Sequence, residues 1–286
     1  MRPLLFCGLL GAAIGFAAAP HRIVSASPNL TEILYGVGAF DRVVAVSDFC
    51  TYPPAAQKLP RVGGWSNPNL EKLALLRPDL VILTDAQAPF VESQLQQLGV
   101  RTLVTPSRTL DDVFRSIAEI GSATGDNRQA RELAAQIRGR LDRIRSRSRA
   151  LPHPKVLCVV ARTPGTLHDL YVVTRGSYLA DLIAIAGGAL PNPSSPEGYS
   201  RLTAETLVTL NPDVILDLVH GEKTALSEDP IRAWQDLPEL KAVRSHRVYP
   251  VVDDYVVHAS QMVVKTALLF ARLLHPEVPA SEWEGQ

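Results

Sequence analysis

The sequence has no excess of charge of either sign and few aromatic residues. Its 29 basic and 29 acidic side chains give a formal net charge of zero, and aromatic residues make up 6% of the 286 positions. Nucleic-acid-binding proteins carry a basic patch, often with interleaved aromatic rings. The composition therefore argues against a nucleic-acid partner.

The motifs of common catalytic sites are also missing. There is no glycine-rich phosphate loop, no Gly-x-Ser-x-Gly elbow and no His-Glu-x-x-His sequence, and the seven histidines are scattered. Asp253 and Asp254 are adjacent carboxylates, but neighbouring side chains at a strand end point apart. We expect no enzyme, no metal site and no cofactor; a secreted hydrolase that uses Asp254 or His258 is the remote alternative.

A long apolar run occurs once, at the N-terminus. Residues 3–16 are nearly all apolar or small and residues 17–19 are alanines, which predicts that residues 1–19 form a cleaved signal peptide. Cys7 follows the bulky Phe6, where the signal of a lipoprotein has a small residue, so we expect no lipid anchor. The expected location is the periplasm, and the lack of a second run of about twenty apolar residues predicts a soluble mature chain.

One pattern occurs twice, 134 residues apart, in residues 71–82 and 205–216. In each copy leucines three residues apart predict a helix with one buried face, a proline ends the helix, and an apolar run predicts a buried strand. The glutamate that opens each copy lies off the leucine face. The copies are identical at five positions, which pair Glu71 with Glu205, Leu73 with Leu207, Leu76 with Leu210, Pro78 with Pro212 and Asp79 with Asp213.

These copies predict two similar α/β lobes. Strands alternate with helices on both sides of residues 126–150, where apolar residues recur every three or four positions and predict one long helix. We expect an N-terminal lobe at 20–125, a linker helix at 126–150 and a C-terminal lobe at 151–286, each lobe Rossmann-like with a parallel sheet. Cys50 and Cys158 would lie in different lobes, so no disulfide is expected.

The ends of the predicted strands indicate a ligand cleft between the lobes. In parallel α/β lobes, ligands bind beyond the carboxyl ends of the strands. Tyrosine and tryptophan on such loops offer stiff, flat apolar surface, which suits a large planar or macrocyclic ligand. The candidate ligand-binding residues are Ser27, Pro28, Asn29, Tyr52, Gly64, Trp65, Arg162, His220, Asp254, Tyr255 and His258.

Some of these candidates also have an ordinary structural explanation. Trp65 could pack in the core, and His258 could be a surface histidine. Glu71 and Glu205 could be exposed glutamates of amphipathic helices. As a pair on two similar lobes, however, they could meet two arginines of a roughly two-fold symmetric partner.

Several segments of the chain resemble exported substrate-binding proteins of ABC importers, and specifically the binders of vitamin B12, iron siderophores and haem. The resemblance rests on Ser-Asp-x-Cys-Thr-Tyr-Pro-Pro-Ala-Ala from Ser47 and Gly-Gly-Trp-Ser-Asn-Pro-Asn-Leu-Glu from Gly63. It also rests on Gly-Ser-Tyr-Leu-Ala-Asp-Leu-Ile-Ala-Ile-Ala-Gly-Gly from Gly176 and Arg-Val-Tyr-Pro-Val-Val-Asp-Asp from Arg247. It covers essentially the whole mature chain.

The resemblance implies a class III periplasmic binding protein, with two lobes on a rigid helix and the ligand between them. It implies that Glu71 and Glu205 bind arginines of a dimeric membrane permease, and that Tyr52 and Trp65 pack against a corrin. We therefore expect a monomer that delivers a corrinoid to an ABC permease. A ferric siderophore or haem is the alternative ligand, and an anionic siderophore would require arginines such as Arg162 in the cleft.

Overall fold

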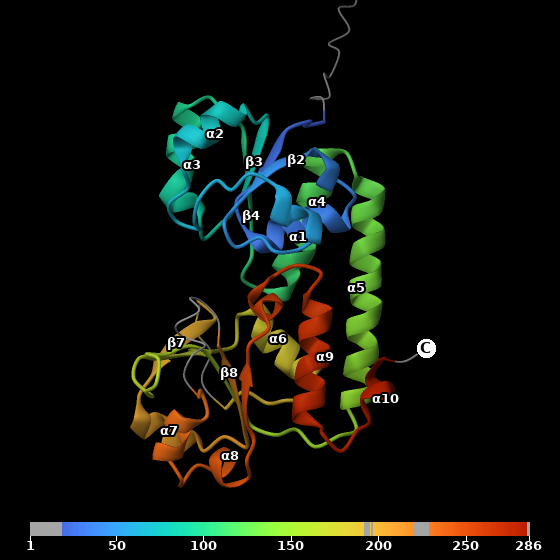
Figure 1. The fold of residues 1–286 in the computed structure, drawn as a ribbon. Helices are drawn as coiled ribbons and strands as arrows, with labels where there is room; N and C mark the ends of the chain where they lie inside the picture. The colour runs from blue at the N-terminus through green and yellow to red at the C-terminus, as the bar shows by residue number, and fades with distance from the viewer. Residues whose placement is uncertain (1–18, 192–194, 196, 220–228, 285–286) are drawn as a thin grey trace, which may run out of the picture.

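The computed structural model describes residues 19–191, 195, 197–219 and 229–284. The chain forms two α/β lobes, one above the other in Figure 1, and a long helix runs beside both. The two-lobed fold expected from the sequence is confirmed. Almost all of the predicted signal peptide lies outside the described residues, as does His220. Within the described part, no helix is both long and apolar enough to cross a bilayer.

The N-terminal lobe is built on a four-stranded parallel sheet with the order β2-β1-β3-β4. Neighbouring residues of β1 and β3 face opposite sides, so α1 and α4 pack on one face of the sheet and α2 and α3 on the other. The strands are β1 (Ile23–Ser25), β2 (Val43–Val46), β3 (Leu80–Thr84) and β4 (Thr102–Thr105). The helices are α1 (Pro28–Gly36), α2 (Leu70–Leu76), α3 (Ala88–Gln97) and α4 (Leu110–Thr124), with short 3-10 helices η1 (Phe40–Arg42) and η2 (Pro54–Lys58).

The C-terminal lobe has a five-stranded mixed sheet with the order β7-β6-β5-β8-β9. Strands β5, β8 and β9 are parallel, as expected, but β6 runs antiparallel to both β5 and β7. The strands are β5 (Val156–Ala161), β6 (Leu170–Val173), β7 (Tyr199–Leu202), β8 (Val214–Leu218) and β9 (Val248–Val251). The helices are α6 (Tyr178–Ile185), α7 (Ala204–Leu210), α8 (Lys241–Arg244), α9 (Val263–Leu274) and α10 (Ala280–Glu284), with η3 (Arg232–Asp236) and η4 (Asp254–Val257).

The reversal of β6 follows from the length of its connection to β5. Only residues 162–169 separate the two strands. A parallel connection needs a crossover of a dozen or more residues, whereas a short loop returns the chain antiparallel. The expectation of two purely parallel sheets therefore holds for the N-terminal lobe, whereas in the C-terminal sheet β6 is antiparallel to both of its neighbours, β5 and the edge strand β7.

The predicted linker is α5 (Asn127–Ser148), a helix of 22 residues that passes both lobes. Its buried face carries Ile137, Leu141 and Ile144, in the three- and four-residue spacing expected from the sequence. Its C-terminal half is rich in arginine, and two of these side chains, Arg145 and Arg147, form ion pairs with Asp142 and Glu282.

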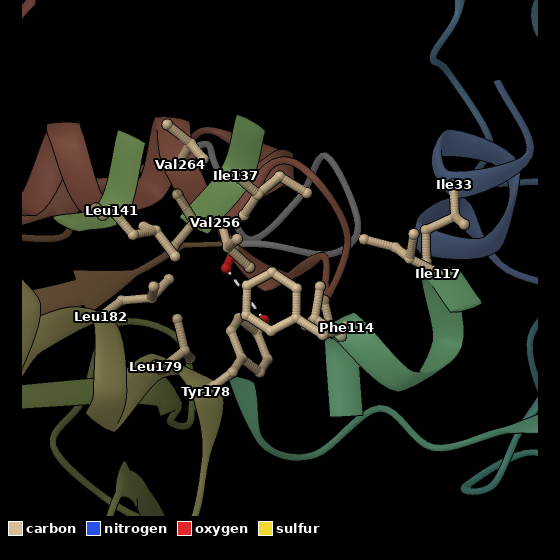
Figure 2. Close-up of a cluster of buried hydrophobic side chains, with 14 of the residues drawn as sticks. Ile33, Phe114, Ile117, Ile137, Leu141, Tyr178, Leu179, Leu182, Val256 and Val264 are labelled. Atoms are coloured by element: carbon tan, nitrogen blue, oxygen red, sulfur yellow. Dashed lines mark hydrogen bonds between the residues drawn. The ribbon is translucent and has the colours of Figure 1, made fainter. Parts of the chain in front are cut away.

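One hydrophobic core continues from lobe to lobe. Figure 2 shows Ile33 of α1 and Ile117 of α4 in the same cluster as Leu141 of α5 and Leu182 of α6. Within this cluster the buried Tyr178 donates its hydroxyl to the carbonyl oxygen of Val256, at 3.1 Å. Because apolar contacts join the lobes directly, the linker helix is not their sole connection.

Candidate ligand-binding site

The lobes enclose a cleft of about 620 Å³. This volume is within the usual range for sites that hold a small molecule or cofactor. The N-terminal lobe contributes residues that follow β1, β3 and β4, together with Trp65. The C-terminal lobe contributes the end of β5, the antiparallel strands β6 and β7, the start of α6, and residues near η4.

A turn at Gly63 and Gly64 places Trp65 at the cleft. Gly63 has a φ of 99°, and an added Cβ there would lie 2.9 Å from the carbonyl oxygen of Asn67. Only glycine adopts this conformation without strain. The buried Gln87 then donates its side-chain amide to the carbonyl oxygens of Trp65 and Ala26, each at 2.9 Å. The backbone of Trp65 is thereby tied to the end of β1, and the residue remains 38% exposed.

The loop after β1 forms the adjoining wall of the cleft. Ser27 donates its hydroxyl to the side-chain oxygen of Asn29 at 2.6 Å, and both side chains are largely buried. Ser27 is the N-cap of α1 but its side chain makes no capping bond. Both polar side chains line the cleft, at the start of a helix where free backbone N–H groups favour polar ligand groups.

The antiparallel strands β6 and β7 of the C-terminal lobe bring two tyrosines into the opposite wall. Tyr171 of β6 and Tyr199 of β7 are stacked, with ring centroids 5.8 Å apart and an angle of 20° between the planes. Burial, reinforced by the nearby Cys158 and Tyr171, raises the pKa of Tyr199 to about 12. Tyr199 is therefore a neutral phenol at physiological pH and presents an uncharged aromatic surface to a ligand.

Three charged residues line the cleft. They are Asp85 after β3, Arg108 after β4 and Glu197 before β7. Asp85 accepts hydrogen bonds from the Ser107 hydroxyl at 2.8 Å and from the backbone N–H of Ala86 at 3.0 Å. The described residues of this lining therefore carry a formal charge of −1.

The comparisons with known proteins agree with this architecture. The profile that describes the periplasmic binding protein family matches residues 23–255. The chain belongs to this family.

Several curated and solved relatives of this binding protein match over most of their length. It is 29% identical to an uncharacterised ABC transporter substrate-binding lipoprotein, YvrC, from Bacillus subtilis, covering 90% of this chain and 81% of YvrC. It is 28% identical to a vitamin B12-binding protein from Vibrio cholerae, covering 88% of this chain and 90% of that protein.

Solved structures with this fold bind more than one kind of ligand. The vitamin B12-binding protein BtuF of Vibrio cholerae has a TM-score of 0.73 and 25% identity, covering 93% of this chain and 99% of BtuF. The haem-binding protein RhuT from Roseiflexus has a TM-score of 0.75 and 25% identity, covering 88% and 98% of the two chains. The family resemblance seen in the sequence is confirmed, and the fold is shared by binders of both chemistries.

Three of the binding protein's predicted ligand residues line the cleft together: Ser27, Asn29 and Trp65. Pro28 and Gly64 are their neighbours in sequence and shape the backbone but are not part of the lining. Their contact with a ligand stays a prediction.

The other candidates in the described residues lie outside the lining. The ring of Tyr52 stands edge-on to Tyr35, with centroids 5.5 Å apart. Asp254 is exposed, while Tyr255 lies under the ammonium group of Lys265, 4.4 Å from the ring centroid. His258 points to Glu32 of α1, with 2.7 Å between Nδ1 and Oε1.

Arg162 is held behind the cleft by the C-terminal lobe itself. Its Nε donates to the buried carboxylate of Asp217 at 2.9 Å, and its two terminal nitrogens donate to the carbonyl oxygens of Thr166 and Pro230. Its side chain is 9% exposed. All three nitrogens of the guanidinium group are thus engaged by this chain.

Residues that the sequence did not single out include Ser107, Arg108, Tyr171, Tyr178, Glu197 and Tyr199. Ser107 and Arg108 follow the end of β4, so the rule that ligands bind beyond strand ends could have found them. Tyr171 and Tyr199 could not be found in this way because the antiparallel pairing of β6 with β7, which presents them, was not expected.

Glu71 and Glu205 are exposed in the first turns of α2 and α7. These helices lie at the outer parts of the two lobes, on the side away from α5 (Figure 1). The backbone N–H of Glu205 and the Thr203 hydroxyl hold the pKa of Glu205 below its ordinary value. Glu205 is therefore ionised at neutral pH.

Proposed function

We propose that this protein captures a corrinoid in the inter-lobe cleft and delivers it to an ABC permease from the periplasm. The observation that carries the proposal is the cleft lining, to which one lobe contributes Trp65 and the other the stacked pair Tyr171 and Tyr199, with few charged residues. Flat aromatic surfaces on both lobes suit a large macrocycle. The vitamin B12-binding relatives, which match over almost their whole length, support the same ligand class.

The charge of the lining favours a corrinoid over the anionic alternatives. Haem carries two propionates, and ferric siderophores are often anionic. Such ligands would meet Asp85 and Glu197 with Arg108 as the single cationic side chain among the described lining residues. Arg162, which the siderophore alternative requires, already neutralises Asp217. A neutral or cationic corrinoid has no such conflict.

Haem would also need an axial ligand. The described lining contains tyrosines but no histidine, cysteine or methionine. Burial raises the pKa of Tyr178 well above its ordinary value and that of Tyr199 to about 12, which opposes the iron-binding tyrosinate form at these two side chains. A corrinoid brings its cobalt already held by the macrocycle and can bind through its faces and amide groups.

Calorimetric titration of the mature protein tests this proposal. We expect cyanocobalamin or cobinamide to bind with a dissociation constant below about 1 μM, equivalent to roughly −8 kcal/mol. Haem and a ferrichrome-type chelate are the matched controls. Tight binding of haem or the iron chelate with no heat from either corrinoid would reject the corrinoid in favour of the alternative ligand.

Delivery to the permease is proposed to use Glu71 and Glu205. Each lies two residues after the N-cap of a seven-residue helix, so the lobes present the two carboxylates in the same way. Two arginines of a dimeric permease could each pair with one carboxylate. In vesicles with the cognate permease, Glu71→Lys with Glu205→Lys should abolish uptake while ligand affinity stays unchanged. Uptake at the normal rate would reject this docking role.

A further inference from the structure

A cluster of polar side chains is buried where α1 meets the segment between η4 and α9. Glu32 of α1 is 2% exposed, and its carboxylate accepts hydrogen bonds from Nδ1 of His258, at 2.7 Å, and from the hydroxyl of Ser260. Gln261 donates its side-chain amide to the backbone carbonyl of Glu32 at 2.6 Å. These four residues, the Glu32 cluster, join residues more than 220 positions apart in the chain.

The segment bonded to Glu32 also forms part of the cleft wall. Val257 and Ala259 line the cleft, whereas His258 and Ser260, which alternate with them, bond to Glu32. The backbone at His258 is extended, with φ −104° and ψ 109°. In extended backbone, successive side chains point to opposite sides. One face of the segment therefore contacts the ligand space and the other contacts the N-terminal lobe.

Close packing around α1 supports the same contact. An added Cβ at Gly36 would lie 3.2 Å from the side-chain nitrogen of Gln261 and 2.8 Å from Leu133. There is therefore no room for a side chain at position 36, and the end of α1 packs closely against Gln261. Ser260 is fully buried, and the side chain of His258 is 13% exposed. Water has little access to replace these hydrogen bonds.

We propose that Glu32 is a positioning residue that fixes the distance between the lobes and, through residues 257–260, the shape of the cleft wall. Glu32 does not line the cleft and acts through His258 and Ser260. Its effect on corrinoid affinity rests on the proposed function, but its effect on the arrangement of the lobes does not. The linker helix and the shared core keep the lobes together without Glu32, while the cluster selects one arrangement.

The distance between the lobes is measured on the unliganded mature protein. Lys72→Cys on α2 and Val208→Cys on α7 place spin labels on exposed positions of the two lobes. Burial raises the thiol pKa of both Cys50 and Cys158, so the labels react with the introduced residues. Pulsed electron paramagnetic resonance then gives the distribution of inter-label distances.

Glu32→Ala should broaden this distribution, because His258 and Ser260 lose their acceptor. Glu32→Gln should retain the wild-type distribution, because its amide carbonyl accepts from His258 while its NH₂ group donates to Ser260. With cyanocobalamin as the probe, Glu32→Ala should weaken binding about tenfold, and Glu32→Gln should stay within about threefold. Ser260→Ala, which removes a single hydroxyl, should broaden the distance distribution less than Glu32→Ala does.

Asp112→Ala is the matched control, since Asp112 is a buried carboxylate whose hydrogen bonds stay within the N-terminal lobe. An unchanged distribution in Glu32→Ala, or in Ser260→Ala if the first variant does not fold, overturns the proposal. Equal broadening in Asp112→Ala overturns it too, because general loss of stability would then explain the result. Failure of the wild type to bind corrinoids rejects the proposed ligand, while the distance measurement still decides the role of Glu32.

Discussion

The two lobes repeat one local unit in atomic detail. In the N-terminal lobe the backbone N–H of Asp79 donates to the carbonyl of Arg22, and the Asp79 carboxylate accepts from the N–H of Arg22, both at 3.0 Å. Asp213 and Lys155 form the same reciprocal pair at 2.8 Å in the C-terminal lobe. The Pro-Asp sequence thus joins each short helix to the start of the first strand of its lobe.

The lobes differ where they approach the ligand. The sheet of the N-terminal lobe is parallel, and this lobe contributes loops and Trp65 to the cleft. The C-terminal lobe adds the antiparallel strands β6 and β7 with Tyr171 and Tyr199. At one matched position the central strands also differ, with Leu83 in β3 and Asp217 in β8. The shared unit builds two similar frameworks, and the added antiparallel pair β6 and β7 makes the two cleft walls chemically different.

The largest expected effect concerns Asp217. Asp217→Ala should lower the free energy of unfolding by about 3 kcal/mol, because it leaves the guanidinium of Arg162 buried without its partner. Urea denaturation measures the change.

Asp217→Leu with Arg162→Met, which imitates the apolar N-terminal lobe, should recover more than half of the loss. Recovery stays incomplete because Trp234 Nε1, 2.9 Å from the Asp217 carboxylate, also loses its acceptor. A loss below about 1 kcal/mol for the single variant would contradict this account.

The next effect compares the two cleft walls. Trp65→Ala should weaken cyanocobalamin binding by about 2 kcal/mol, or roughly thirtyfold, because the ring is stiff and already positioned. Tyr171→Ala should cost less, because Tyr199 still presents an aromatic surface. Calorimetry measures both. Phe90→Ala is the control, since Phe90 packs on Trp65 but does not line the cleft. Equal losses of affinity for all three variants would contradict the prediction that Trp65 and Tyr171 contact the ligand and Phe90 does not.

A smaller effect concerns the helix ends of the repeated unit. Arg77 and Asn211 end α2 and α7 in the left-handed conformation, with φ values of 46° and 41°. Arg77→Gly should raise the free energy of unfolding by about 1 kcal/mol, because glycine adopts this conformation without a Cβ clash. Asn211→Gly should raise it less, since asparagine tolerates the conformation. Thermal unfolding of both variants measures the two gains in stability. A larger gain for Asn211→Gly than for Arg77→Gly would refute the prediction.

The smallest expected effect is the pH dependence of the stability that Asp213 contributes. Burial raises the pKa of Asp213, but hydrogen bonds from Lys241 and the Lys155 N–H more than offset it, so the pKa lies below its ordinary value. A carboxyl whose pKa is depressed by folding contributes stability above its unfolded pKa of about 3.9 and loses it as pH falls through the folded pKa. The stability difference between wild type and Asp213→Asn should therefore shrink as pH is lowered from 6 to 3. A constant difference in urea titrations would contradict this.

Much of the framework could be predicted from the sequence. Leucine spacing and Pro-Asp marked α2 and α7, and a 24-residue periodic segment marked α5. Of the site, Ser27, Asn29 and Trp65 were found because they follow a strand or precede a helix. Tyr171 and Tyr199 were missed because the pairing of β6 with β7, which residues 174–198 separate in the chain, leaves no local pattern.

The sequence by itself determined the local units of this protein, because helix periodicity, capping and chain reversal depend on residues a few positions apart. Only the tertiary structure decided that Arg162 pairs with Asp217 and that His258 faces Glu32 rather than the cleft. These partners lie 55 and 226 residues apart. Their pairing follows from the burial of charges that must find a partner inside the folded chain.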